Sequence, residues 1–183
     1  MEIIIVLALI VLITVFFVAQ YNRLIRLNIT AEEAWAQIEV QLKRRADLIP
    51  NLIETVKGYA AHEQSTFDAV VTARAKATSA SSVADTAAAD GALTQALRGL
   101  LAVAEAYPDL KASTNFAALQ DELATTENKV AFSRQFYNDT VRQLNTAIKS
   151  IPTNFFAGFA KVSEREFYEV ADPQDREVPN VKF

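Results

Sequence analysis

The chain has 183 residues, a formal net charge of −4, no cysteine and one histidine. The absence of cysteine excludes disulfides, thiolate metal sites and cysteine nucleophiles. The sequence also lacks the surplus of basic residues that is typical of a nucleic-acid-binding surface. Only four glycines and five prolines interrupt the sequence, which favours long helices over short strands joined by turns. The composition therefore predicts an all-α protein, and the length is enough for a membrane anchor and one domain of ordinary size.

The amino terminus carries a long apolar run. Residues 3–19 read IIIVLALIVLITVFFVA, with Thr14 as the only polar side chain. About 20 uncharged residues form roughly 30 Å of helix, the thickness of a bilayer core. A buried helix of a soluble protein and a cleaved signal peptide are the alternatives, but a signal peptide needs a basic flank and a small-residue cleavage site. We predict an uncleaved transmembrane helix within residues 1–26.

The next segment, residues 27–76, has the pattern of an amphipathic helix. Its apolar positions recur at spacings of three and four, as in a coiled coil, and Arg45 occupies one of these positions. This seam consists of Trp35, Ile38, Leu42, Ile49, Leu52, Val56 and Tyr59. Thr30 and Glu33 have the spacing of a capping box that would start a new helix after the anchor. A helix that continues from the anchor without interruption is an equally allowed alternative.

Pro50 lies in the middle of this pattern. A proline removes one backbone donor from a helix and displaces the carbonyl four residues earlier. The apolar seam keeps its phase across Pro50, so we predict a helix kink and not a break. Asp47 and Asn51 are placed to satisfy the freed backbone groups or a neighbouring helix.

Two further helices follow. Residues 78–92 are rich in serine, alanine and aspartate, a composition that predicts a loop and a weak helix start. We expect the second helix over about residues 85–106 and its end at Pro108. The third is expected over about residues 115–151, where Phe132 and Phe136 lie beside its seam and widen the apolar face. We predict an antiparallel helical bundle over residues 27–151, with three long helices, or four if the first breaks at Pro50.

Residues 152–183 lose the helical pattern and contain three of the five prolines. Their aromatic side chains are too numerous for a solvated tail. We predict an extended C-terminal strap that packs these aromatics on the bundle, on a partner subunit or on the membrane surface. A disordered tail is the alternative, and REFYEV, residues 165–170, allows short strand pairing.

No pattern of catalytic or metal-ligating residues is visible, because a single His62 cannot supply a di-iron, haem or zinc site. We therefore predict no enzyme activity and no cofactor. The polar residues that stand out lie near the middle of the first and third helices, and we expect a register network or subunit interface formed with the two phenylalanines. The candidates are Arg45, Asp47, Asn51, Glu127, Asn128, Arg134, Phe132 and Phe136. A buried Arg45 would need a carboxylate such as Glu127; a solvated charged face is the alternative.

Several stretches resemble one known family. Four stretches resemble blocks of the LemA family of bacterial proteins: EEAWAQIEVQLKRRADLIPNLIETVKGYAAHE (residues 32–63), YPDLKASTNFAALQDELATTENKVAFSRQFYNDTV (107–141), NTAIKSIPTNFFAGF (145–159) and the closing VPNVKF. The resemblance covers nearly the whole chain, with a weak match over residues 75–93. It implies one amino-terminal membrane helix, a helical bundle usually outside the cytoplasm, and no known catalytic residues. DLIPNL, which contains Pro50, is a hallmark of the first block.

Together these patterns predict a non-enzymatic, single-span protein of the bacterial cell membrane that forms a homo-oligomer through its bundle. The large apolar surface of the helices and tail is the reason to expect self-association, with another envelope protein as a further partner. A sensor or partner-binding module is the alternative function. The side of the membrane stays open, because Arg23 and Arg26 after the span favour a cytoplasmic domain, whereas the family resemblance implies an extracytoplasmic one.

Overall fold

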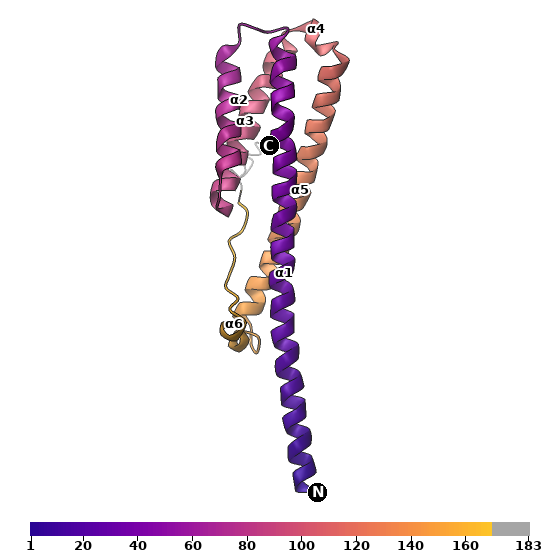
Figure 1. The fold of residues 1–183 in the computed structure, drawn as a ribbon, viewed down its shortest axis with the longest axis vertical. Helices are drawn as coiled ribbons and strands as arrows, with labels where there is room; N and C mark the ends of the chain where they lie inside the picture. The colour runs from indigo at the N-terminus through magenta and orange to yellow at the C-terminus, as the bar shows by residue number, and fades with distance from the viewer. Residues whose placement is uncertain (170–183) are drawn as a thin grey trace, which may run out of the picture. The chain divides into compact units, whose positions relative to one another are not determined.

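The computed structural model describes residues 1–169, and every regular element among them is a helix. The helices, labelled in Figure 1, are α1 (Glu2–Lys57), α2 (Gln64–Ser79), α3 (Val83–Glu105), α4 (Pro108–Lys111), α5 (Thr114–Lys149) and α6 (Asn154–Ala160). The all-α prediction is confirmed, and the described residues include no strand in the region of REFYEV. The predictions for residues 170–183 lie outside the described part of the chain.

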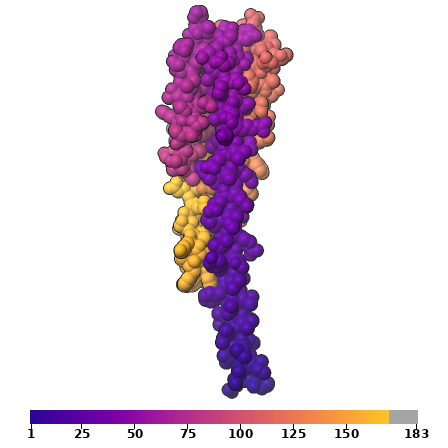
Figure 2. All heavy atoms as spheres, in the orientation of Figure 1, coloured from indigo at the N-terminus to yellow at the C-terminus, as the bar shows by residue number. Residues whose placement is uncertain are grey.

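Helix α1 runs without interruption from the apolar segment into the domain. The Thr30 hydroxyl donates to the carbonyl of Arg26 at 3.0 Å, one turn earlier in the same helix. Thr30 is therefore inside a helix, and the predicted capping box is wrong; the continuous helix, the alternative, is correct. The apolar window within α1 is long and apolar enough to cross a membrane, and none of it is buried. In the face shown in Figure 2 no other segment covers the start of α1.

Pro50 is inside α1, as expected. Because Pro50 has no N–H, the carbonyl of Ala46 lacks its usual donor one turn later. Arg74 of α2 supplies a replacement, with its Nε donating to the Ala46 oxygen at 2.8 Å. The side chains of Asp47 and Asn51, to which we assigned that task, are exposed. A neighbouring helix, and not a residue near Pro50 in sequence, satisfies the freed carbonyl.

The first break comes after Lys57, so the prediction of one helix over residues 27–76 is wrong. The chain turns at residues 58–63, where Tyr59 and Ala60 donate backbone hydrogen bonds to the carbonyl of Val56 at 3.0 and 2.9 Å. Tyr59, counted in the predicted seam, is 47% exposed, whereas its neighbour Ala60 is 1% exposed. Four long helices result in the described part of the chain, but α1 ends about two turns beyond Pro50.

The remaining boundaries agree more closely with the sequence. Helix α3 begins after Ser82, whose hydroxyl oxygen accepts from the backbone N–H of Asp85 at 3.0 Å. Pro108 does not end this helix; it begins the short helix α4, because a proline fits the first turn, where its missing donor is not needed. Helix α6 corrects the prediction of an extended segment after Pro152, and residues 162–169 beyond it have no regular structure.

The chain divides into two compact units, each with its own core. The first comprises residues 1–38 and 133–167, and the second comprises residues 39–132 and the chain from Tyr168. In the second unit, α1, α2, α3, α4 and α5 all contribute to one apolar core. Its fully buried members include Ile49, Leu52, Val56, Phe67, Val70, Leu100, Leu110 and Phe116. Most of the predicted seam residues of this part of α1 therefore do face a core.

The first unit has smaller clusters. Leu24 of α1 packs with Ala147 of α5 and Phe156 of α6. Ala31 of α1 packs with Leu144 of α5 and with Val162, which follows α6. The segment after α5 thus contributes to the core of this unit through both its helical and its irregular part.

Candidate functional site

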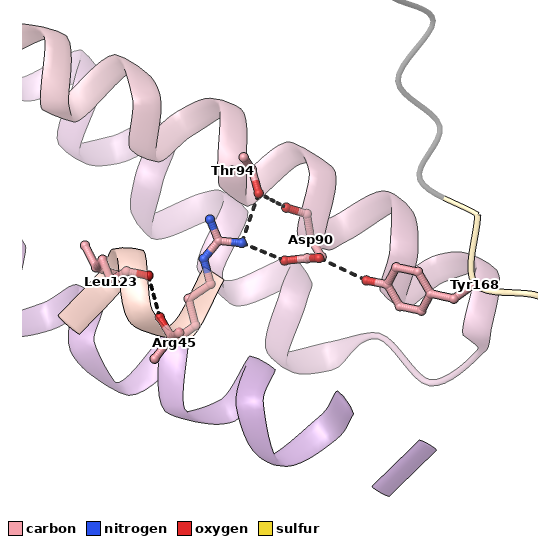
Figure 3. Close-up of polar contacts among 6 residues, drawn as sticks. Arg45, Asp90, Thr94, Leu123 and Tyr168 are labelled. Carbon is pink, nitrogen blue, oxygen red and sulfur yellow. Dashed lines mark hydrogen bonds and ion pairs between the residues drawn. The ribbon is translucent and has the colours of Figure 1, made fainter. Parts of the chain in front are cut away.

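Arg45 is the buried charge in the second unit. It lies between Leu42 and Ile49 on the apolar face of α1, and only 3% of it is exposed. Its Nη1 donates to Asp90 Oδ1 and to Thr94 Oγ1, both at 2.9 Å (Figure 3). A buried guanidinium requires a carboxylate partner, as the sequence predicted, but the structure supplies Asp90 and not Glu127.

Asp90 connects three segments of the chain. It is 1% exposed and lies one turn before Thr94 on the same face of α3, where the Thr94 hydroxyl donates to the Asp90 backbone carbonyl at 2.9 Å. Its second oxygen, Oδ2, accepts from the hydroxyl of Tyr168 at 2.9 Å (Figure 3). Each carboxylate oxygen therefore has a donor from a different segment, Arg45 from α1 and Tyr168 from the chain after α6. We call Arg45, Asp90, Thr94 and Tyr168 the Asp90 network.

The electrostatics of Arg45 follow from this burial. Loss of hydration lowers the pKa of Arg45 from its ordinary value, and the negative charge of Glu127 opposes that change, as does Tyr168. Arg98 adds a repulsion that lowers the pKa further. A guanidinium stays protonated at neutral pH in spite of such shifts. Glu127 therefore acts on Arg45 through its field, while Asp90 makes the ion pair at 2.9 Å.

The first unit holds a second group of polar contacts, centred on Arg165. Its Nη2 donates to Glu32 Oε1 at 2.6 Å and to Asn28 Oδ1 at 3.0 Å, both on α1. Asn145 of α5 holds the backbone of the same residue: Asn145 Nδ2 donates to the Arg165 carbonyl at 2.9 Å, and the Arg165 N–H donates to Asn145 Oδ1 at 3.0 Å. We call Arg165, Asn28, Glu32 and Asn145 the Arg165 clamp. It fastens the irregular segment after α6 to α1 and α5.

Tyr137 extends this attachment. It is 1% exposed, its ring lies 5.4 Å from that of Trp35, and its hydroxyl donates to the Glu166 carbonyl at 2.9 Å. Burial raises the pKa of Tyr137; the positive charge of Arg165 opposes the rise and Glu166 adds to it.

The predicted network residues are not brought together as a group. The side chains of Asp47, Asn51, Glu127 and Asn128 are exposed, and Arg134 is half-buried. Phe132 is 71% exposed and Phe136 is 38% exposed. The ion pair that joins α1 to α5 in the second unit is formed by their neighbours Arg44 and Glu122, at 2.9 Å.

Asp90, Thr94 and Tyr168 were not among the predicted residues, although the sequence contains a signal for two of them. Asp90 lies three residues before Leu93 and seven before Leu97, so it continues the buried stripe of α3. A carboxylate on that stripe is the complement of the arginine on the stripe of α1. Because the residues around Asp90 are small and polar, we predicted a loop there and did not extend the buried stripe of α3 to Asp90. Tyr168 lies in a segment without periodicity, which offers no signal.

Residues 1–169 include no cluster of three or more side chains that could bind a metal ion. The second unit does contain a hollow of about 330 Å³ beside the Asp90 network. It is lined by Glu39, Leu42, Lys43, Ala46, Asp47, Ala77, Thr78, Ala80, Thr86, Asp90 and Leu93.

Comparison with protein-family models adds the decisive observation. The model of the LemA family matches residues 34–183, which is most of the chain. The chain belongs to the LemA family. This confirms the resemblance that the sequence blocks indicated. The whole Asp90 network of this LemA-family chain lies within the matched region, whereas Asn28 and Glu32 of the Arg165 clamp and the apolar run of residues 3–19 precede it.

Two curated relatives are magnetosome proteins. The magnetosome protein MamQ of Magnetospirillum gryphiswaldense is 26% identical over 172 residues, which cover 78% of this LemA-family chain and 63% of the relative. MamQ 2 of Paramagnetospirillum magneticum is 22% identical over 176 residues, which cover 82% of the chain and 65% of the relative. The aligned part therefore spans less than two thirds of the length of these relatives.

Proposed function

We propose that this chain is a non-enzymatic, single-span protein of the bacterial envelope whose helices form an antiparallel bundle that self-assembles. One observation carries the proposal: Phe132 and Phe136 of α5 are 71% and 38% exposed in a chain whose apolar amino-terminal run is exposed as well. The run can be covered by lipid. Large apolar side chains on a long helix of the domain need another cover, and a second copy of the chain provides one.

The absence of an enzymatic role is supported by the way the buried polar groups are used. Both carboxylate oxygens of Asp90 already accept hydrogen bonds, from Arg45 and Tyr168. A general base needs an oxygen that faces a substrate. The contacts of the Asp90 network instead connect three segments of the chain, as expected for groups that fix the packing of helices.

The family supports an extracytoplasmic position for the domain, against the weaker signal of Arg23 and Arg26 after the span. The names of the MamQ relatives associate them with the magnetosome. Because the chain spans less than two thirds of their length, we propose that it shares with them a helical domain, and we do not extend the magnetosome association to it.

The test is the particle size of the full-length protein, extracted gently from its native membrane and measured by electron microscopy and mass photometry. We expect a symmetric oligomer that dissociates in Phe132→Ser and in Phe136→Ser. Gln135→Ser is the matched control, because Gln135 is exposed on α5 between the two phenylalanines. A monomeric wild type, or a particle unchanged by both phenylalanine substitutions, would contradict self-assembly through this face.

A second candidate, a ligand-binding or sensor module, is favoured by the hollow of about 330 Å³ beside Asp90. Its volume lies within the usual range for small-molecule sites, and it combines apolar and charged lining residues. Native mass spectrometry of the purified protein tests it. A bound small molecule present in the wild type and absent in Ala77→Phe, which fills the hollow, would favour this function over a purely structural one. A wild type without any bound mass would count against it.

A further inference from the structure

The segment that begins after α5 presents an apolar face beside the amino-terminal run of α1. Residues 150–160 contain no charged side chain and are bounded by Lys149 and Lys161. Phe155 and Phe159 lie four residues apart in α6 and share one side of this short helix, and Ile151 lies in the turn that precedes it. Ile151, Phe155 and Phe159 are 77%, 66% and 80% exposed, so the described residues leave most of the surface of these three large apolar side chains uncovered.

The opposite side of α6 is held against α1. Phe156 is 6% exposed, and its ring lies edge-on to those of Phe17 and Phe16, at centroid distances of 4.8 and 6.4 Å. The Thr153 hydroxyl donates to Gln20 Oε1 at 3.3 Å. Figure 1 shows α6 beside α1. These contacts fix α6 along the axis of α1 between Phe16 and Gln20.

This position corresponds to a definite depth. Phe16 and Phe17 come two to three residues before Ala19, the last residue of the apolar run, or about 4 Å along a helix that rises 1.5 Å per residue. If the run spans a bilayer, α6 lies at the boundary between acyl chains and headgroups. Amphipathic helices bind at this boundary, with their apolar faces buried roughly 5–10 Å.

We propose that α6 is a membrane-interface helix whose Ile151, Phe155 and Phe159 insert into the leaflet on the domain side of the span. The proposal rests on the proposed function in one respect, that residues 3–19 cross the membrane. The flanking Lys149 and Lys161 fit this location, because lysines at the ends of membrane segments reach the phosphate level. Lys149 also pairs with Glu164 at 2.7 Å, which leaves Lys161 as the more available of the two for phosphates.

A hollow between α6 and α1 supports a lipid occupant. It measures about 260 Å³ and is lined by Phe17, Val18, Tyr21, Phe156 and Phe159, all apolar or aromatic side chains. Since Phe17 and Val18 belong to the run that lipid surrounds, the hollow is continuous with a lipid-facing surface. A second copy of the chain is the competing occupant, but it would have to displace lipid from the same residues.

The absence of cysteine makes a direct test practical. Full-length Phe159→Cys and Phe155→Cys, labelled with an environment-sensitive fluorophore, are reconstituted into phosphatidylglycerol–phosphatidylcholine vesicles. The vesicles contain lipids with a nitroxide either high or low on the acyl chain. We expect the high nitroxide to remove most of the emission of both labels and the low nitroxide to remove much less. Gln135→Cys, at an exposed position of α5 in the same unit, is the matched control and should keep its emission.

Leu9→Cys, in the middle of the apolar run, distinguishes failure of the interface-helix proposal from failure of the proposed transmembrane span. Quenching of Leu9→Cys without quenching of Phe159→Cys would overturn the interface helix and leave the span intact. If neither label is quenched, the run itself is not in the bilayer and the proposed anchor fails with it. A label at Phe159 that is shielded from water, insensitive to lipid nitroxides and close to a label on a second copy would assign this face to an oligomer contact and overturn the lipid proposal.

Discussion

The two most buried charges of the second unit, on Arg45 and Asp90, depend on each other. Taking either ion out of water costs several kcal/mol, and their ion pair with its additional hydrogen bonds offsets that cost. The pair therefore adds little net stability while it is intact, but its loss leaves a buried charge without a partner. The role we assign to it is the selection of one packing of α1 against α3.

Asp90→Asn tests this dependence. The amide keeps the shape of the carboxylate but removes its charge, so Arg45 remains buried without an anion in contact with it. We expect the free energy of unfolding to fall by about 3–5 kcal/mol. Urea unfolding of the full-length protein in detergent, followed by circular dichroism, measures the change. Asp121→Asn, an exposed residue of α5, should be neutral, and equal midpoints for the two variants would refute the argument.

Tyr137 makes stability depend on pH in the alkaline range. Its pKa is raised in the folded protein, so folding favours the neutral phenol. Its contribution is complete below the unfolded pKa of about 10 and is lost as the pH rises through the folded value. Tyr137→Phe cannot ionise and should lose less stability than the wild type above that pH.

At neutral pH the same substitution should cost about 1 kcal/mol, the usual value of the hydrogen bond that Tyr137 donates to Glu166. Urea midpoints measured at pH 7 and at several values from 9 to 11 would show both effects. Tyr59→Phe, at an exposed position in the turn after α1, should keep the alkaline loss of the wild type. Parallel losses in the wild type and Tyr137→Phe would show that Tyr137 does not titrate in this way.

Among the elements, α1 and α2 show how a proline is tolerated inside a long helix. Pro50 leaves the Ala46 carbonyl without its helical donor, and Arg74 of α2 replaces that donor at 2.8 Å. Arg74→Met should therefore cost about 1 kcal/mol in the wild type and less in a Pro50→Ala background, where the backbone N–H of residue 50 returns. A double-mutant cycle of unfolding free energies measures the coupling. Additive effects would mean that the two sites act independently.

The sequence predicted some elements well for identifiable physical reasons. The seam from Phe116 through Leu144 is long and strictly periodic, so the expected range of α5 differs from the structure by only a residue or two. The end of α1 was missed because Tyr59 continues the apolar spacing even though the helix has ended. Helix α6 was missed because seven residues are too few to establish a period.

The candidate site could be predicted only in part. The position of Arg45 on an apolar stripe implied a buried carboxylate partner, and that inference is confirmed. The choice of Glu127 assumed that the partner lay in the other conspicuous polar cluster. A partner on α3 could be inferred only by extending the stripe of Leu97 and Leu93 back to Asp90, through a stretch whose composition suggested a loop.

For the whole molecule, the proposed extracytoplasmic domain makes a prediction that needs no knowledge of the partner. His62 is exposed in the turn between α1 and α2, and the chain has no other thiol to compete with His62→Cys. A membrane-impermeant maleimide should label His62→Cys in cells whose outer permeability barrier has been opened and whose cytoplasmic membrane is intact. Leu110→Cys, buried in the core, should remain unlabelled in the same cells. Labelling of His62→Cys only after lysis would place the domain in the cytoplasm.

The unbroken course of α1 has a mechanical consequence for the first unit. Phe17, Gln20, Leu24 and Asn28 follow one another at three- and four-residue steps along α1, and each contacts the segment after α5 or its close neighbours. A rigid helix turns as one body, so a single inserted residue between Gln20 and Leu24 would rotate the two sets of contacts apart by about 100°. A seven-residue insertion would restore the angle almost completely but move the two sets of contacts about 10 Å apart along the axis. Because Phe156 contacts both Phe17 and Leu24, the first unit fixes the rotation of α1 and its axial position at the same time.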